Sequence, residues 1–402
     1  MKNITIFSKH FWPENFKIND VCFYLSKKYK INVYTSYPGY NNLNYKIIKK
    51  NKINYKGLKI NYFKSFNRLS NSFISIFLDY FLYLINLFLK INFSFKDKTS
   101  ICITFATSPV FQALPAIYYS KIKKIPSIIW VQDLWPEVLE DTGYVKNKFV
   151  LKLLDKIVKY IYNETDIIIA QSESFKNHLK KKYKLKNKLF TLHQPSEYVF
   201  QKRNRIKKNN FKITYAGNFG KAQDFNTILQ AFSSNKINKN ISLYLIGSGK
   251  KLNYIKKKIK ENKLYKRVFL INYKNKKILY KLLRDSSCFF LSLNDGKSLN
   301  KTIPGKFQTY VSFGKPIIIC SNSDLNNFIK NQNIGFASRP KQVNKLINNI
   351  NKSYKLTEIQ KKKIYISSRD IYKNLFAIKK VTSMLEEYIN LAYKTHAKKT
   401  LS

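Results

Sequence analysis

The order of segments along the chain predicts an α/β fold made of two Rossmann-like domains. Short apolar runs, typical of buried parallel strands, alternate with helical stretches over most of the 402 residues. A polar, basic stretch at 201–210 lacks this periodicity, and the rhythm resumes at Phe211. The length also exceeds what one core usually fills. We therefore expect domains at 1–196 and 211–355, a linker at 197–210, and a C-terminal helical segment at 356–402 whose last part could return to the first domain.

Strand-like runs recur in both halves of the chain. They lie at 2–7, 31–35, 58–63, 100–105, 127–131, 167–170 and 189–192 in the first half, and at 211–215, 241–246, 268–271, 288–293, 316–320 and 335–337 in the second. Helical stretches separate most of them, which indicates right-handed β-α-β units and a parallel sheet in each half. In such sheets, ligands collect beyond the carboxyl ends of the strands.

Charge and cysteine usage narrow the possible classes of protein. The formal net charge of +53 comes almost entirely from lysines spread over the whole length, which is typical of solvated helix faces. Nucleic-acid binding therefore ranks below the enzymatic hypotheses, although a general attraction to anionic surfaces follows. The four cysteines form no close pair and have no histidine at metal-ligand spacing. This pattern argues against a metal site and favours a reducing, cytoplasmic compartment.

The segment 73–91 is almost wholly apolar and aromatic, interrupted by Asp79 and Asn86. About 20 apolar residues are needed to cross a bilayer and a central Asp is costly there, so we interpret the segment as a helix lying on a membrane. The alternative is a buried helix of the α/β domain, because a strand-helix-strand unit needs a helix here. Nearby lysines favour an anionic surface, so we expect a cytoplasmic protein that is peripheral at the inner face of the cell membrane.

Two predicted strands of the first half end in segments rich in Trp, Pro and Glu. One segment covers 130–137 and holds two of the three tryptophans, and the other covers 9–15. Polar and aromatic residues gathered beyond strand ends are more typical of a ligand site than of a core. The two segments therefore suggest one shared site.

Three segments of the second half favour an anionic ligand. Segments 213–224 and 245–251 are glycine-rich turns between a strand and a helix, where N–H groups favour a bound phosphate. Either turn alone could be a plain tight turn. In segment 302–310, Pro304, Gly305 and Lys306 stand at the expected start of a helix, where a diphosphate could dock. The alternative for Lys306 is an ordinary surface lysine.

These segments resemble the GT-B glycosyltransferases of family 4, and within them the O-antigen L-fucosamine transferase-like subgroup. The resemblance rests on 10–20, 130–137 with 142–143, 216–224 and 302–316, in the family's order over nearly the whole chain. It implies two Rossmann-like domains facing a central cleft, the N-terminal one for the acceptor and the C-terminal one for the donor. It also implies retaining sugar transfer from a nucleotide diphosphate, which we expect to be UDP, with no cofactor and no bound metal.

The resemblance and the chemistry of the residues assign a candidate site. Lys306 would neutralise the departing diphosphate, and Asp133 and then Glu14 would orient hydroxyl groups. The donor would contact Gly217, Asn218, Gly220, Gln223, Gly247, Gly249, Gly305, Lys306, Gln308 and Thr309. The acceptor would contact His10, Phe11, Trp12, Trp135 and Glu137. Alternatives stay open: a helix N-cap for Asp133, a solvated acid for Glu14, a first-turn residue for Glu137, and a structural role for His10 and the aromatic residues.

Two departures from the wider family change the expected chemistry. Asn218 and Gln223 stand where family members commonly place Arg and Lys, so Lys306 must carry more of the leaving-group stabilisation. Lys301 and Thr309 stand where the family usually has two glutamates separated by seven residues. Ribose binding through a carboxylate is therefore not implied for this chain.

We expect a retaining glycosyltransferase that moves a sugar, such as an N-acetylated deoxyamino sugar, to a polyprenyl-diphosphate-linked glycan in O-antigen or capsule synthesis. Its expected partners are the nucleotide-sugar donor, the polyprenyl-linked glycan and an anionic membrane surface, without nucleic acid. The alternative is a nucleotide-sugar epimerase of the same architecture, which would need acid and base carboxylates around the sugar carbon. A nucleic-acid-binding protein ranks third.

Overall fold

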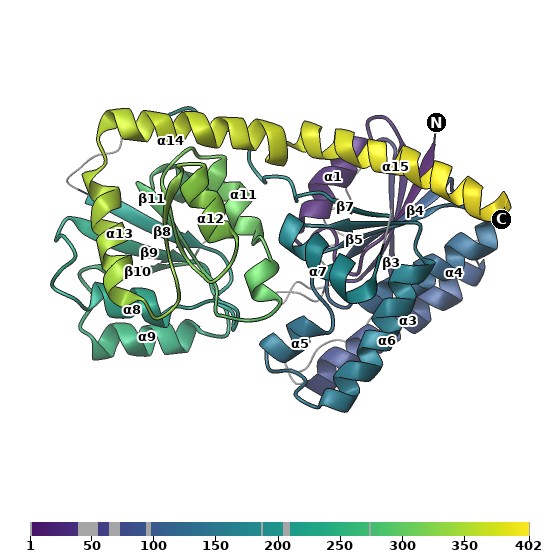
Figure 1. Ribbon diagram of the computed structural model, residues 1–402, viewed down its shortest axis with the longest axis horizontal. Coiled ribbons are helices and arrows are strands. Elements are labelled where there is room, and N and C mark those ends of the chain that lie inside the picture. The colour runs from purple at the N-terminus through teal and green to yellow at the C-terminus, as the bar shows by residue number, and fades with distance from the viewer. Residues whose placement is uncertain are drawn as a thin grey trace. The chain divides into compact units, whose positions relative to one another are not determined.

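The computed structural model describes residues 2–38, 55–63, 73–93, 98–185, 188–203, 210–272 and 275–401. The chain forms two compact units (Figure 1). Unit 1 contains Met1–Pro195 and Ile378–Ser402, and unit 2 contains Ser196–Ala377. Each unit is a parallel sheet covered by helices, so the predicted α/β class with two Rossmann-like sheets is confirmed. The predicted linker at 197–210 lies partly outside the described residues.

Unit 1 contains a seven-stranded sheet in the order β3-β2-β1-β4-β5-β6-β7, with every pair parallel. The strands are β1 (Asn3–Phe7), β2 (Lys30–Ser36), β3 (Leu58–Phe63), β4 (Ile101–Ala106), β5 (Ser127–Val131), β6 (Ile167–Ala170) and β7 (Leu189–Thr191). All residues of β4, β5 and β6 are buried because helices cover both faces, which explains their continuous apolar runs. The strand order reverses between β1 and β4, and ligands bind at such a switch point.

Helices pack on both faces of this sheet. Helices α1 (Lys17–Leu25) and α15 (Ile378–Leu401) pack on one core, and α3 (Phe73–Phe93), α4 (Ala113–Lys123), α6 (Lys148–Glu164) and α7 (Glu173–Tyr183) pack on the other side. The short α5 (Glu137–Asp141) and the 3-10 turn η2 (Val110–Gln112) complete the unit. Asn147 caps α6 and Ser172 caps α7, each by accepting hydrogen bonds from backbone N–H groups of the first turn.

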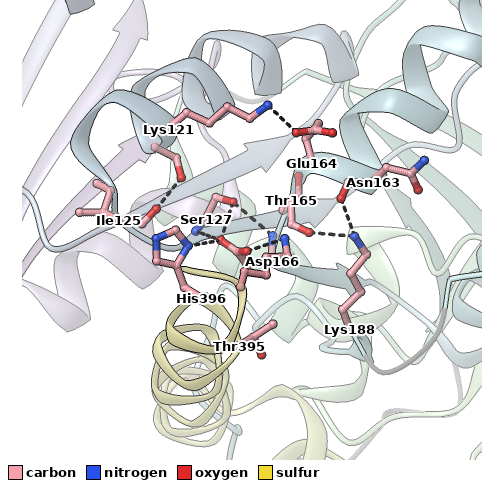
Figure 2. Close-up of polar contacts among 12 residues, drawn as sticks. Lys121, Ile125, Ser127, Asn163, Glu164, Thr165, Asp166, Lys188, Thr395 and His396 are labelled. Carbon is pink, nitrogen blue, oxygen red and sulfur yellow. Dashed lines mark hydrogen bonds and ion pairs between the residues drawn. The ribbon is translucent and has the colours of Figure 1, made fainter. Parts of the chain in front are cut away.

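The return of the C-terminal helix to unit 1 is confirmed, and a buried carboxylate anchors it there (Figure 2). Val381, Leu385 and Ile389 of α15 enter the core beside α1. Near the end of the helix, His396 Nδ1 and Lys399 Nζ lie 3.2 and 2.8 Å from the carboxylate of Asp166. The same carboxylate accepts hydrogen bonds from Ser127.

Unit 2 contains a six-stranded parallel sheet in the order β10-β9-β8-β11-β12-β13. The strands are β8 (Phe211–Ala216), β9 (Ile241–Ile246), β10 (Val268–Ile271), β11 (Cys288–Ser292), β12 (Ile317–Cys320) and β13 (Gly335–Ser338). The order reverses between β8 and β11, which predicts a ligand site at the carboxyl ends of these two strands.

Two helical layers cover the sheet of unit 2. Helices α8 (Asn226–Phe232), α9 (Leu252–Glu261) and α13 (Val343–Lys355) pack on one core, and α10 (Lys276–Arg284), α11 (Gly305–Val311) and α12 (Leu325–Asn331) on the other. The 3-10 turn η4 (Leu299–Lys301) precedes α11.

The helical segment predicted at 356–402 is divided between the two units. Helix α14 (Glu358–Ile371), which starts with a capping box at Thr357, and the π-helical turn η5 (Tyr372–Phe376) belong to unit 2, whereas α15 belongs to unit 1. The division has a packing cause, because Ile371 and Phe376 are buried in the unit 2 core while the apolar face of α15 is buried in unit 1.

Helix α3 covers the segment 73–91 and packs on the α/β domain with one face, as the second alternative for this segment expects. One face, with Asp79, Tyr83 and Leu87, is buried against unit 1, and the Asp79 carboxylate lies 2.9 Å from the buried Lys9 Nζ. That ion pair explains the acid in the middle of an apolar helix. The opposite face remains exposed. Among the described residues, no helix is long and apolar enough to cross a membrane.

Candidate active site

Glycines bring the two glycine-rich turns of unit 2 into direct contact. A Cβ on Gly247 would lie 2.2 Å from the Gly217 carbonyl oxygen, and one on Gly249 would lie 2.3 Å from Asn218 Oδ1. Both glycines have a positive φ, which side chains rarely adopt. Only glycine therefore allows the loops after β8 and β9 to pack this closely.

Most backbone N–H groups of the first turn already have partners within the protein. Gly217 N–H donates to Ile246 O at 2.9 Å, Phe219 N–H to Ser248 O at 2.7 Å, and Gly220 N–H to Gln223 Oε1 at 2.8 Å. This finding corrects the expectation that these amides would cradle a phosphate. The glycines and Gln223 shape the loop, and a positive charge must come from side chains.

Lys306 supplies that charge directly over the first turn. A Cβ on Gly217 would lie 2.2 Å from Lys306 Cε, so the missing side chain at Gly217 is what makes room for the lysine. Lys306 Nζ lies 5.3 Å from the centre of the Tyr215 ring, and among the described residues it makes no hydrogen bond or ion pair. Burial lowers the pKa of Lys306 to about 8. The structure therefore excludes the surface-lysine alternative.

The other predicted donor residues of α11 support the position of Lys306. Pro304 precedes the helix in an extended conformation, and Gly305 is its first residue. Gln308 and Thr309 are buried beneath them. With its amide oriented to satisfy both groups, Gln308 donates to the carbonyls of Pro304 and Gly305, which fixes the first turn rather than a ligand.

Sequence reasoning missed one residue of this site, Lys251. Its Nζ donates to Gln223 O at 2.6 Å, and its backbone N–H donates to Phe219 O, so it fastens the second turn to the first. Burial lowers the pKa of this lysine. The basic end of segment 245–251 was the signal that could have identified it. At the switch point, Asn294 after β11 also binds the carbonyls of Lys221 and Ala222.

In unit 1, Asp133 lies beside the loop that follows β4. Asp133 Oδ2 accepts hydrogen bonds from Ser108 N at 2.9 Å and Ser108 Oγ at 2.8 Å. Helix α5 starts at Glu137 after Pro136, so Asp133 is not its N-cap. Burial raises the pKa of Asp133 above its ordinary value, and the Ser108 hydrogen bonds and the nearby His10 only partly oppose this shift. Asp133 Oδ1 accepts no hydrogen bond from any described residue and is available to a ligand hydroxyl.

His10 and Glu14 form a buried pair after β1. His10 Nδ1 lies 2.7 Å from Glu14 Oε2, and the His10 ring stacks on Phe16 with centroids 4.8 Å apart. Glu14 is only 3% exposed, so it is not the solvated loop acid considered as its alternative. Its carboxylate fixes the orientation of the imidazole, which makes Glu14 a positioning residue for His10.

The predicted acceptor aromatics are mainly packing residues. Phe11 is 1% exposed and packs against Phe23 in the core. Trp135 is also buried, contacts Phe111 and donates from Nε1 to Ser108 Oγ at 3.1 Å. Trp12 is partly buried and packs against the same Phe23 ring. Phe11 and Trp135 are therefore buried by packing contacts, and we expected them to be exposed to the acceptor.

Glu137 is engaged within unit 1 rather than open to a ligand. Its carboxylate accepts hydrogen bonds from His178 Nε2 at 2.8 Å and Lys182 Nζ at 2.7 Å, both on α7. Burial alone would raise the pKa of Glu137, but these two partners lower it to about 2. Glu137 therefore joins α5 to α7 as a first-turn residue. Among the described residues, no cluster of His, Cys, Asp and Glu could hold a metal ion.

Comparison with known proteins agrees with this geometry. Residues 196–370, nearly all of unit 2, match the model of a family described as glycosyl transferases group 1. No curated protein matches the chain by sequence.

Several solved structures share the fold of the whole chain. HepE of Anabaena in complex with UDP has a TM-score of 0.69 at 12% identity, covering 97% of this chain and 100% of that one. Sucrose-phosphate synthase of Thermosynechococcus elongatus has a TM-score of 0.74 at 11% identity, covering 98% and 100%. WaaG, a glycosyltransferase involved in lipopolysaccharide biosynthesis, has a TM-score of 0.64 at 11% identity, covering 98% and 99%.

The whole chain therefore has the GT-B fold, and its unit 2 is similar to the group 1 glycosyl transferases.

Proposed function

We propose that this glycosyltransferase extends a polyprenyl-diphosphate-linked glycan in the synthesis of a surface polysaccharide such as O-antigen or capsule. Unit 2 would bind the donor, a UDP-sugar, and unit 1 the acceptor. The observation that carries the donor assignment is Lys306, a half-buried ammonium that lies over Gly217 and has no anionic partner among the described residues. Two proteins that share the fold support this proposal: HepE has been solved in complex with UDP, and WaaG is involved in lipopolysaccharide biosynthesis.

The chemistry needs positive charge where the donor breaks. Cleavage of the bond between sugar and diphosphate leaves an oxocarbenium-like sugar and a diphosphate that gains one negative charge on its terminal phosphate, and a fixed cation stabilises that charge. Lys306 supplies it, and Lys251, which joins the two turns, lies on the neighbouring loop. The loop amides that are already bonded within the protein contribute less than expected.

On the acceptor side, Asp133 is proposed to orient the attacking hydroxyl. Its Oδ2 is held by Ser108, which fixes the carboxylate and leaves Oδ1 to accept a hydrogen bond. His10, oriented by Glu14, is the second polar group and follows β1, which β4 separates from the strand before Asp133. In front-face attack the departing diphosphate itself takes the hydroxyl proton, so no protein nucleophile is required.

The test is transfer from UDP-sugars to a short polyprenyl-diphosphate-linked glycan, followed by mass spectrometry, with the product anomer identified by NMR. We expect an added sugar with the donor's anomeric configuration, and a loss of at least about 100-fold in Lys306→Ala. Incubation without acceptor separates the alternative, because donor isomerised in that reaction would identify an epimerase. Full turnover in Lys306→Ala, or no transfer to any lipid-linked glycan, would overturn the proposal.

A further inference from the structure

The outward face of α3 presents a row of large apolar side chains. Leu78, Phe81, Leu82, Ile85 and Leu89 are between 37% and 54% exposed, although Asp79, Tyr83 and Leu87 on the opposite face are buried. The spacing of three and four residues places the exposed side chains along one stripe of the helix. Helix α3 is therefore apolar on two sides, and only one side is used by the core of unit 1.

The neighbouring helices also expose apolar side chains. Tyr118 and Ile122 of α4 are exposed, and the Tyr118 ring contacts Phe88 of α3 with centroids 5.8 Å apart. Helix α6, which contacts α4, exposes Phe149 at 76% and Leu153 at 52%. Figure 1 shows α3, α4 and α6 grouped together in unit 1. We call this surface the apolar face; it consists of Leu78, Phe81, Leu82, Ile85, Leu89, Tyr118, Ile122, Phe149, Val150, Leu153 and Tyr160.

Exposure of this extent is unusual for a protein that stays in water. Exposed apolar residues scattered singly need no explanation, but a contiguous apolar patch marks a docking site for a protein or a membrane. Helix α6 shows this clearly, because Val158 and Ile161 already fill its core-facing side while Phe149 and Leu153 face solvent. The apolar face is therefore a candidate docking surface.

Positive charge surrounds the apolar face. Besides Lys121, which pairs with Glu164, exposed lysines on the same three helices or directly beyond their ends are Lys90, Lys124, Lys148, Lys152, Lys156 and Lys159. The acids of α6 are already engaged, since Glu164 pairs with Lys121 and Asp155 pairs with Lys182. A partner that fits this surface must present many anions next to an apolar layer. A second copy of the chain would instead bring two lysine-rich rims together, which like-charge repulsion opposes.

We propose that unit 1 binds to the surface of an anionic phospholipid bilayer through the apolar face. The aromatic and aliphatic side chains enter the boundary between headgroups and acyl chains, and the surrounding lysines contact lipid phosphates. The helices lie on the membrane and do not cross it. This inference deepens the proposed function, because a polyprenyl-diphosphate acceptor is itself held in a membrane.

The Lys9–Asp79 pair connects this surface to the acceptor side of unit 1. Asp79 lies on α3, and Lys9 directly precedes His10. The Lys9 carbonyl also accepts hydrogen bonds from Thr35 and Ser36, and the Lys9 N–H donates to Gln112. A helix seated on lipid is thus joined by one buried ion pair to the loop that carries His10 and Glu14.

The test is co-sedimentation of the full chain with vesicles, in the absence of donor. Vesicles of equal parts phosphatidylcholine and phosphatidylglycerol are compared with vesicles of phosphatidylcholine alone. We expect binding to the anionic vesicles, and at least about tenfold weaker partitioning for Phe81→Glu/Leu89→Glu and for Phe149→Glu/Leu153→Glu. The matched control is Tyr265→Glu/Ile359→Glu, which changes residues of unit 2 that are 59% and 71% exposed and leaves binding unchanged.

Circular dichroism and UDP binding verify that each variant is folded. Because vesicle binding is measured without donor or acceptor, failure of the sugar-transfer assay and failure of this proposal are separate results. Equal vesicle binding by wild type and apolar-face variants would overturn it, as would binding abolished by salt alone and insensitive to these variants. A wild-type dimer that the variants convert to monomers, without affinity for vesicles, would assign the face to self-association and also overturn it.

Discussion

Two lysines of unit 2 are both shielded from water, but only one of them, among the described residues, has hydrogen-bond partners. Burial lowers the pKa of both Lys306 and Lys315 to about 8. Lys315 Nζ donates to the carbonyls of Arg284 and Ser286 and so closes the end of α10. Lys306 has no such hydrogen bond among the described residues. A charged group kept in poor solvent without a partner is typical of a functional site rather than of a structural one.

This contrast predicts opposite results when each lysine is replaced by methionine. Lys315→Met leaves two carbonyls without their donor and should lower the free energy of unfolding by about 2 kcal/mol or more. Lys306→Met removes an unpaired, desolvated charge and should leave that free energy within about 0.5 kcal/mol of wild type, or raise it. Urea unfolding measures both values. A strongly destabilised Lys306→Met would mean that Lys306 has a structural role.

Residue-level patterns predicted some parts of the site better than others. The positions of Gly217, Gly247 and Lys306 in turns and at a helix start followed from strand-turn-helix spacing, because the residues that determine a turn are adjacent in the sequence. The partners of the loop N–H groups did not, since they lie on other loops. The His10–Glu14 pair spans four residues and could have been anticipated, whereas the Lys9–Asp79 pair depends on how α3 packs.

At the scale of elements, α15 is held to unit 1 by apolar packing and by ion pairs of two kinds. The buried Asp166 carboxylate pairs with His396 and Lys399. On the solvent side, Glu386 of the same helix pairs with Lys28, whose side chain is largely exposed. Buried and exposed pairs on one helix allow a matched comparison.

Removing the buried acid should destabilise unit 1 far more than removing the exposed one. Asp166→Asn weakens the contacts that His396 and Lys399 make with a buried carboxylate, and we expect a loss of about 1–3 kcal/mol. Glu386→Gln removes a surface pair and should cost less than about 1 kcal/mol. Denaturant midpoints of the two variants provide the measurement. Equal effects would show that Asp166 does not anchor α15.

Most elements were predicted from apolar runs, and the exceptions have packing causes. Strands such as β4 and β12 are buried along their whole length, so their sequences carry the signal. The sequence of 356–402 predicts a continuous helical segment. Its division at Ala377 arises because Ile371 and Phe376 are buried in the core of unit 2, whereas Val381 is buried in the core of unit 1. The sequence of α3 likewise does not reveal which of its apolar sides faces the core.

At the scale of the whole molecule, the two units have separate sheets and separate cores. The residues assigned to the donor all lie in unit 2, within the stretch that matches the glycosyl transferase model. Ligand binding stabilises only the state that binds it. The donor nucleotide should therefore stabilise unit 2 and leave the stability of unit 1 unchanged.

Calorimetric unfolding should show two transitions, and UDP should move only that of unit 2. At a UDP concentration of roughly 100 times Kd, the stabilisation expected from mass action is about 2.7 kcal/mol. Asp166→Asn assigns the transitions, because it lowers only that of unit 1. A single transition, or an equal shift of both transitions by UDP, would contradict this assignment.

The central claim, that Lys306 binds the diphosphate of the donor, is tested most directly by titration calorimetry of UDP at about pH 9 in buffers of different ionisation enthalpy. Because the pKa of Lys306 is about 8 in the free protein, the lysine is mostly neutral at this pH, and a bound diphosphate raises its pKa. Wild type and the exposed-lysine control Lys277→Met should take up close to one proton, whereas Lys306→Met should take up none and bind at least about tenfold more weakly. Unchanged affinity and proton uptake in Lys306→Met would contradict the claim.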